Sequence, residues 1–251
     1  MRQSRFKYLP AWSEVTDLVS LTLLPYRFKL RNIRRIELES GGEILIVGTL
    51  HHLHLSIKQY SLADLENLII NYSANVIGLE ARPLDLSRGL LPMAPIEMAQ
   101  AALIARRRNI PIFGFDSWDE LEYETLAAKG EPLDFNSARR NDQMVQQLLA
   151  GLGSASRTLA LTGYSHVRPF VQRLLRVGSE REISAEEKKE LFATRGGKDR
   201  LDPELQPSLE LTIAHLEGYL AHFAQDNSWS RRVRKKLERL RELRRELAGR
   251  A

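Results

Sequence analysis

Short apolar runs alternate with longer amphipathic stretches over the first two-thirds of the chain. Four of these runs have the length and apolar content of buried β-strands. They cover residues 43–48, 75–79, 110–116 and 157–166. The segments between them carry apolar residues at helical spacing, so we expect a helix between each strand and the next.

The first of these strands is the second arm of a predicted hairpin. The segment NIRRIELES precedes Gly41-Gly42, a typical hairpin turn, and EILIVG follows it. Because EILIVG is continuously apolar, we place it in the centre of the sheet. A helix then begins at Ser61, with Asp64 as the carboxylate of a capping box. Further helices are expected over residues 96–108 and 137–150.

Strands that alternate with helices in this way indicate an α/β fold, with a mostly parallel sheet, helices on both faces and right-handed connections. We divide the chain into an N-terminal extension (1–30), the α/β domain (31–180) and a C-terminal helical appendage (181–251). The appendage would begin with a polar linker or lid, and its next helix would start at Asp202-Pro203.

The fold predicts where the functional residues meet. In open parallel sheets ligands bind beyond the carboxyl ends of the strands. The predicted strands are followed by His51, Glu80, Asp116 and His166, and both histidines end a Gly-x-x-His motif. We expect each glycine to permit a tight turn that directs its histidine over the edge of the sheet. His52 and His54 have no counterpart in the second motif and are interpreted as accessory or exposed.

Composition limits the chemistry at this edge. The 251 residues are 43% hydrophobic and 27% charged, as in an ordinary globular protein, and contain no cysteine. Disulfides, thiolate zinc sites and cysteine nucleophiles are therefore excluded, so any metal needs histidine and carboxylate ligands. No apolar run approaches the roughly 20 residues of a membrane span. We therefore expect a cytoplasmic protein without a transmembrane segment.

The net charge of +5 comes from the C-terminus, because residues 231–250 alone carry +7. Val233, Leu237, Leu240, Leu243 and Leu247 form an apolar stripe on this basic helix. We expect the stripe to dock on the body of the protein or on a second copy, which would make a homo-oligomer. Binding of the helix to nucleic acid or another acidic surface is the alternative.

The motifs also resemble a known family, the TraB/Tiki superfamily, which includes erythromycin esterases and ChaN-like proteins. The resemblance covers about residues 43–176 and consists of GTLH (48–51), GLE (78–80), RNDQM (140–144) and GYSH (163–166), with Asp116 after the third strand. Two features depart from the family pattern. Arg139 stands where such sequences usually have a glutamate, and the C-terminal membrane spans of the archetype are absent.

His51, Glu80 and His166 are our predicted metal ligands. Two neutral imidazoles and one carboxylate suit a divalent ion that keeps open positions for water and substrate. Tiki-like proteins are described as metal-dependent proteases, so the resemblance implies a metal-dependent, peptidase-like hydrolase. Manganese, cobalt, zinc and iron are the candidate metals.

Supporting roles are expected for five further residues. Arg140 would stabilise an oxyanion or bind a substrate carboxylate, and Asn141 would donate a hydrogen bond. Asp116 would orient a histidine ligand. Tyr164 lies within the second motif and joins this surrounding shell. Arg82 is the alternative counter-ion for Glu80.

Two other functions use the same residues. As in erythromycin esterases, His51 would be a general base whose tautomer is set by Glu80, without a metal. As in ChaN-like proteins, the crevice would bind a peptide, haem or metal without catalysis. The expected substrate is a peptide by resemblance, and an ester or amide of a small molecule is the next choice.

Overall fold

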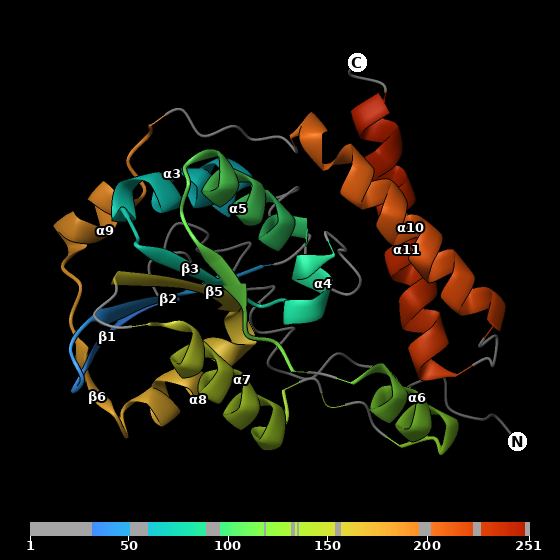
Figure 1. Cartoon of the computed structure of the whole chain (residues 1–251), viewed down its shortest axis with the longest axis horizontal. Helices are drawn as coiled ribbons and strands as arrows, with labels where there is room; N and C mark the ends of the chain where they lie inside the picture. Colours follow the sequence, from blue (N-terminus) through green and yellow to red (C-terminus); the bar gives the residue numbers. More distant parts are fainter. Residues whose placement is uncertain are drawn as a thin grey trace, which may run out of the picture.

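The sheet has six strands in the order β4-β3-β5-β2-β1-β6 (Figure 1). The computed structural model describes residues 32–50, 60–88, 96–117, 119–131, 134, 136–153, 157–195, 202–222 and 227–248. In chain order the strands are β1 (Ile33–Leu38), β2 (Glu43–Thr49), β3 (Val76–Leu79), β4 (Ile112–Gly114), β5 (Arg157–Gly163) and β6 (Gly178–Arg181).

Four strands form a parallel core, and two antiparallel strands extend it at one edge. β5 pairs in parallel with both β2 and β3, and β3 pairs in parallel with β4. β1 pairs antiparallel with β2 and with β6. The predicted hairpin is confirmed, with Gly41 and Gly42 both at positive φ in its turn. The predicted α/β class with a mostly parallel sheet is also confirmed.

Helices cover both faces of the sheet. On one face, α3 (Leu62–Tyr72) and α5 (Ile96–Arg107) pack on the side chains of Leu45, Val47 and Leu161. On the other face, α7 (Ala138–Gly151) and α8 (Tyr164–Leu174) pack on Ile44 and Ile46 (Figure 1). Successive side chains of a strand point to opposite faces of the sheet. The position of a residue within its strand therefore decides which pair of helices it packs against.

Local sequence sets where the helices begin. The Ser61 side chain accepts from the Asp64 backbone N–H at 3.4 Å, and the Asp64 carboxylate accepts from the Ser61 N–H at 2.9 Å. This is the predicted capping box of α3. Ser137 caps α7 by accepting from the N–H of Arg140 at 3.2 Å. The Ser137 cap fixes Arg140 and Asn141 in the first turn of α7.

The second Gly-x-x-His motif corrects the prediction at the end of β5. The strand stops at Gly163, and Tyr164, Ser165 and His166 form the first turn of α8. The two motifs are also offset by one residue, since Thr49 and not Gly48 pairs with Gly163. They are therefore not equivalent in register.

Gly48 has a different physical use from the tight turn expected for it. It lies inside β2, and an added Cβ would meet Cγ2 of Val167 at 2.8 Å and Cα of Tyr164 at 3.0 Å. Glycine therefore lets the first turn of α8 approach β2 closely.

Four elements were not predicted: β6, α4 (Pro83–Ser87), α6 (Glu120–Ala128) and α9 (Ala185–Leu191). β6 is an edge strand, and the predicted domain boundary between residues 180 and 181 falls inside it. Asn71 of α3 donates its side-chain amide to backbone carbonyls at the end of α9, including that of Ala193 at 2.8 Å. Residues up to at least Ala193 therefore pack with the α/β domain.

The C-terminal appendage is a helical pair. The short 3₁₀ turn η3 (Pro203–Leu205), capped by Asp202 as expected, leads into α10 (Gln206–His222), which packs against α11 (Ser228–Ala248). Two ion pairs show that the helices run antiparallel: Arg241–Glu217 at 2.6 Å and Arg244–Glu210 at 3.3 Å. The predicted apolar stripe of α11 docks on the body of the same chain: Val233, Leu237, Leu240 and Leu243 are buried in one core cluster with Leu209, Ile213 and Leu216 of α10.

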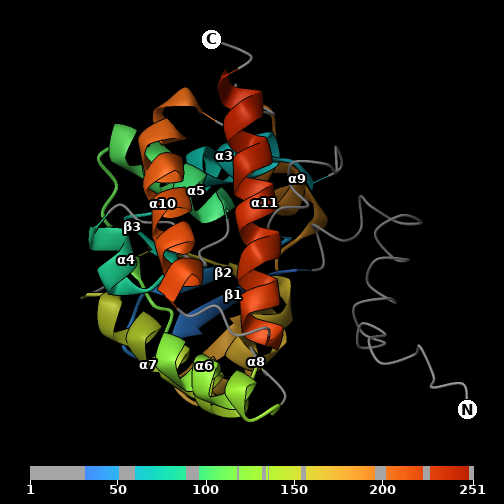
Figure 2. The same cartoon turned by 90° about the vertical axis from the view of Figure 1, so that its right-hand side faces the viewer.

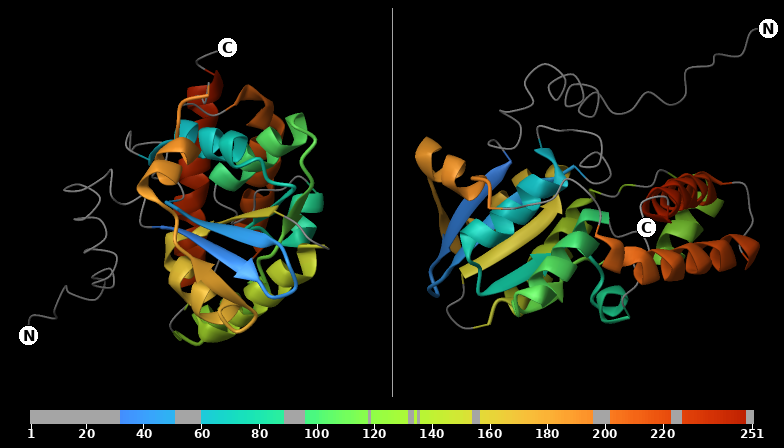
Figure 3. Two further views of the ribbon diagram at one scale, coloured as in Figure 1. Left: turned by 90° about the vertical axis from the view of Figure 1, so that its left-hand side faces the viewer. Right: turned by 90° about the horizontal axis from the view of Figure 1, so that it is seen from above.

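The helical pair stands at the end of the sheet to which the parallel strands run (Figures 1, 2 and 3). Arg107 of α5 pairs with Asp202, and with Glu204 at 2.7 Å, which ties η3 to the α/β domain. Tyr219 of α10 donates to the Glu124 carboxylate of α6. None of the helices that the structure describes is both long and apolar enough to cross a bilayer.

Candidate functional site

Five of the predicted site residues meet at the carboxyl edge of the parallel strands, on the face covered by α7 and α8. Glu80 follows β3, Asp116 follows β4, Arg140 and Asn141 lie in α7, and His166 lies in α8. Each of the five is at most 8% exposed. A buried cluster of this kind persists only if its charges and hydrogen-bonding groups are paired.

Glu80 is held by β5 through one of its carboxylate oxygens. Oε2 accepts from the Thr162 hydroxyl at 2.7 Å and from the backbone N–H of Gly163 at 2.5 Å. The other oxygen, Oε1, faces Arg140 NH2 at 3.3 Å and His166 Nε2 at 3.6 Å. The carboxylate therefore has one structural oxygen and one directed at the cluster.

Arg140 lies between two carboxylates. Its Nε and NH2 both donate to Asp116 Oδ1, at 3.1 and 2.9 Å, while NH2 also faces Glu80. NH1 lies 3.5 Å from His166 Nε2. Arg140 thus binds two carboxylates of this chain, and it supplies a cation beside the buried Glu80.

The pKa of the Asp116 carboxyl is raised to about 6, chiefly because burial disfavours its charged form. The nearby negative charge of Glu80 raises it further. Arg140 and the Ser117 N–H, which donates to Oδ1 at 2.8 Å, act in the opposite direction. The charge of Asp116 therefore changes in mildly acidic solution.

The His166 ring is oriented by Asn141. Nδ1 of His166 lies 2.8 Å from Oδ1 of Asn141. The Asn141 amide nitrogen is directed at the Asn136 carbonyl at 3.0 Å, the Asn136 Oδ1 at 2.8 Å and the Ser137 carbonyl at 2.9 Å. Asn141 therefore orients the ring of His166.

Two of the three predicted metal ligands face each other. Two donor atoms on one tetrahedral ion, each bound at roughly 2.0–2.1 Å, lie about 3.4 Å apart. Glu80 Oε1 and His166 Nε2 are 3.6 Å apart, so this pair fits a shared divalent ion. The third predicted ligand, His51, lies outside the described residues, as do His52 and His54. Within the described ranges no group of three His, Asp or Glu side chains has the arrangement of a metal site.

Arg82 and Tyr164 both make contacts outside the buried cluster. Arg82 pairs with Asp85 of α4 through Nε at 2.5 Å and NH2 at 3.0 Å. Arg82 thus forms an ion pair with Asp85, while Arg140 places a cation beside Glu80. Tyr164 is partly buried and packs against the α3/α5 side of the core.

Two contributors were missed in the sequence, Thr162 and Asn136. Thr162 lies just before the GYSH motif, on the same face of β5 as the cluster. A polar residue at this position was the signal that could have identified it. Asn136 precedes α7, accepts from Asn141, and donates to the Ser165 carbonyl at 3.2 Å. It joins the start of α7 to the first turn of α8.

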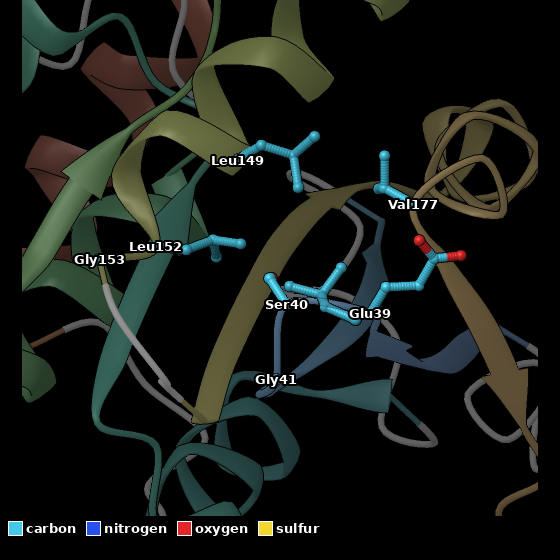
Figure 4. Close-up of a pocket in the computed structure, with 8 residues that line it drawn as sticks. Glu39, Ser40, Gly41, Leu149, Leu152, Gly153 and Val177 are labelled. Atoms are coloured by element: carbon cyan, nitrogen blue, oxygen red, sulfur yellow. The ribbon is translucent and has the colours of Figure 1, made fainter.

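A pocket of about 410 Å³ lies at the opposite edge of the sheet (Figure 4). It is lined by the β1–β2 turn, the end of α7 and Val177, and its main apolar residues are Leu38, Leu149 and Leu152. The pocket holds none of the predicted site residues.

Comparisons of the chain with protein-family models, with curated proteins and with solved structures gave no match. The resemblance to the TraB/Tiki superfamily therefore rests on the motifs alone.

Proposed function

We propose that this protein is a hydrolase whose active centre is the pair of His166 and Glu80, with a divalent metal as cofactor and a peptide as substrate. The observation that carries the proposal is the separation of 3.6 Å between Nε2 of His166 and Oε1 of Glu80 at the carboxyl edge of the sheet. Peptide is the substrate class implied by the motif resemblance, and a small ester or amide is the next choice.

The surrounding residues orient this pair. Thr162 and Gly163 bind Oε2 of Glu80, which directs Oε1 at the cluster. Asn141 binds Nδ1 of His166, which directs Nε2 at the same place. A divalent ion held by His166, Glu80 and the predicted ligand His51 would polarise a substrate carbonyl and lower the pKa of water.

Arg140 places a positive charge beside the pair. Its NH2 and NH1 lie 3.3 Å from Glu80 Oε1 and 3.5 Å from His166 Nε2. Hydrolysis of an amide or ester develops negative charge on the carbonyl oxygen, and a fixed cation in a buried site stabilises that charge. This supports a role for Arg140 in electrostatics and positioning.

The position of Arg140 also favours a second candidate, a hydrolase without a metal. Glu80 already has a cation beside it, so no further ion is required for its burial. His166, with its Nδ1–H held by Asn141, would then accept a proton from water at Nε2 as a general base. A non-catalytic peptide, haem or metal-binding protein is the remaining alternative.

Elemental analysis tests the metal. Tag-free protein is dialysed against manganese, cobalt, zinc or iron, and wild type is compared with His166→Asn, Glu80→Gln and His51→Ala. His215→Asn is the matched control, because His215 is exposed on α10. We expect about one metal ion per chain in wild type and control and a loss in the three site variants.

Equal metal content in wild type and His166→Asn would reject the metal-dependent proposal. Peptide and ester hydrolysis assays with and without chelator then separate the candidates. Turnover that survives chelation and is lost in His166→Asn supports the metal-free base. Metal bound at the site without turnover of any substrate in the panel supports a binding protein.

A further inference from the structure

Asn141 and His166 make a contact whose direction can be assigned from the surrounding atoms. An asparagine side chain has one acceptor oxygen and one NH₂ group, and the two orientations of the amide must be distinguished by their partners. In the structure the NH₂ group has three oxygen neighbours within 3.0 Å: the Asn136 carbonyl, the Asn136 Oδ1 and the Ser137 carbonyl.

The opposite orientation of the Asn141 amide is excluded. It would place Oδ1 against these three oxygens, with no hydrogen between them. Two of the three are backbone carbonyls, which never donate. Oδ1 of Asn141 must therefore face His166 Nδ1, and a contact of 2.8 Å to an acceptor requires Nδ1 to carry the hydrogen.

The assignment of Nδ1 fixes the other ring nitrogen. A neutral imidazole with its hydrogen on Nδ1 has its lone pair on Nε2. Nε2 faces NH1 of Arg140 at 3.5 Å, and a guanidinium only donates, which agrees with a lone pair at this atom. Oε1 of Glu80, at 3.6 Å from Nε2, lies beyond hydrogen-bond distance.

We infer that Asn141 is a positioning residue that selects the Nδ1–H tautomer of His166 and so presents the Nε2 lone pair to the site. This inference rests on the proposed function only for its consequence in catalysis. Both the metal-bound and the metal-free reaction need an unprotonated Nε2, whereas the opposite tautomer would present a hydrogen there.

The arrangement also explains the position of Asn136. This residue holds the Asn141 amide and donates to the Ser165 carbonyl in the first turn of α8 at 3.2 Å. The two asparagines thus hold both the side chain of His166 and the backbone of the residue before it.

NMR of ¹⁵N-histidine-labelled full-length protein tests the inference without any assay of activity. The chain has six histidines, so the His166 signals are assigned by their loss in His166→Asn. In neutral wild-type protein we expect a hydrogen-bearing Nδ1 and an unprotonated Nε2. A hydrogen on Nε2 in wild type would overturn the inference, whatever reaction the protein catalyses.

The variant Asn141→Leu tests the selection. Leucine offers no acceptor, so we expect a shift of the neutral ring toward the Nε2–H tautomer, and a loss of about 10–100-fold in metal affinity or turnover. An unchanged tautomer in a folded Asn141→Leu would show that Asn141 does not select it. Gln146→Leu, on the exposed side of the same helix, is the matched control and should keep the wild-type spectrum.

Asn141→Ala provides the second variant if the leucine substitution unfolds the protein. Alanine also lacks an acceptor, so the neutral ring should again shift toward the Nε2–H tautomer. An unchanged Nδ1–H tautomer in folded Asn141→Ala would contradict the inference. Unchanged metal affinity and turnover in a variant whose tautomer shifts as expected would instead count against the proposed function and leave the role of Asn141 intact.

Discussion

Arg140 donates two N–H groups to a single carboxylate oxygen of Asp116, at 2.9 and 3.1 Å, inside the protein. The pair joins the first turn of α7 to Asp116, which lies two residues after the end of β4. It also places a cation within 3.3 Å of Glu80, so two buried carboxylates depend on one guanidinium.

Removal of Arg140 should destabilise the fold strongly. In Arg140→Ala both Glu80 and Asp116 lose their buried cation, and breaking such a pair from one side costs about 3–5 kcal/mol. Denaturant unfolding measures the change. Arg139→Ala is the control, because Arg139 is exposed and its pair with Glu122 is 3.5 Å long, so its effect should stay within about 0.5 kcal/mol. Similar losses in the two variants would contradict the buried pairing.

Asp116 should make stability depend on pH. Its carboxyl has a pKa of about 6 in the folded protein and 3.8 as the reference value, so the folded state binds more protons between these values. The free energy of unfolding should therefore rise as the pH falls from about 7 to 4, by at most about 3 kcal/mol from this group. Relative to Asp116→Asn, wild type should gain stability over that range. A carbon-13 titration of Asp116 with its midpoint near 4 would refute this.

Two buried threonines should respond in opposite ways to valine. Thr162→Val removes the hydroxyl that donates to Glu80 at 2.7 Å and leaves the carboxylate short of a partner, at a cost of about 1–3 kcal/mol. The hydroxyl of Thr49, fully buried at the end of β2, has no partner among the described residues. Thr49→Val should therefore leave stability unchanged or raise it by about 1 kcal/mol. Thermal unfolding of both variants checks the contrast, and equal destabilisation would contradict it.

The apolar stripe of α11 should act within one chain. Leu240 is 4% exposed and belongs to the core cluster that includes α10, so Leu240→Ala should cost about 2–5 kcal/mol. Leu211→Ala on the 48% exposed face of α10 is the control and should cost little. If the stripe instead joined two copies, sedimentation would show dissociation in Leu240→Ala, and the stability of wild type would depend on protein concentration.

The fold was predictable because its signals are local. Each signal can be recognised in a continuous stretch of sequence, as for the apolar runs at residues 43–48 and 157–163 and the capping residues Ser61 and Ser137. The parallel arrangement of the strands follows from the regular alternation of strands with helices. β6 escaped prediction because its sequence, GSER, has no apolar residue, and the strand exists through its pairing with β1. The end of β5 was predicted three residues too late because TGYSH continues the strand without a side chain that would cap the following helix.

The site residues were predictable as a group, but their pairing was not. Glu80 has two candidate arginines in the sequence, and the nearer one, Arg82, is directed to Asp85 by the start of α4. Arg140, sixty residues from Glu80, faces it because the connection between β4 and β5 brings α7 over the carboxyl edge. The side chain that orients His166 depends on the angle between α7 and α8, which no local pattern encodes.

Gly48 offers an opportunity for protein engineering. The residue has no polar atom in the cluster, yet an added methyl group would press on Cα of Tyr164, two residues before His166, and on Val167, one residue after it. Substitutions at this position would displace the histidine-bearing turn from the sheet while every polar side chain of the site stays in the sequence. The placement of the turn that carries His166 thus becomes accessible to design.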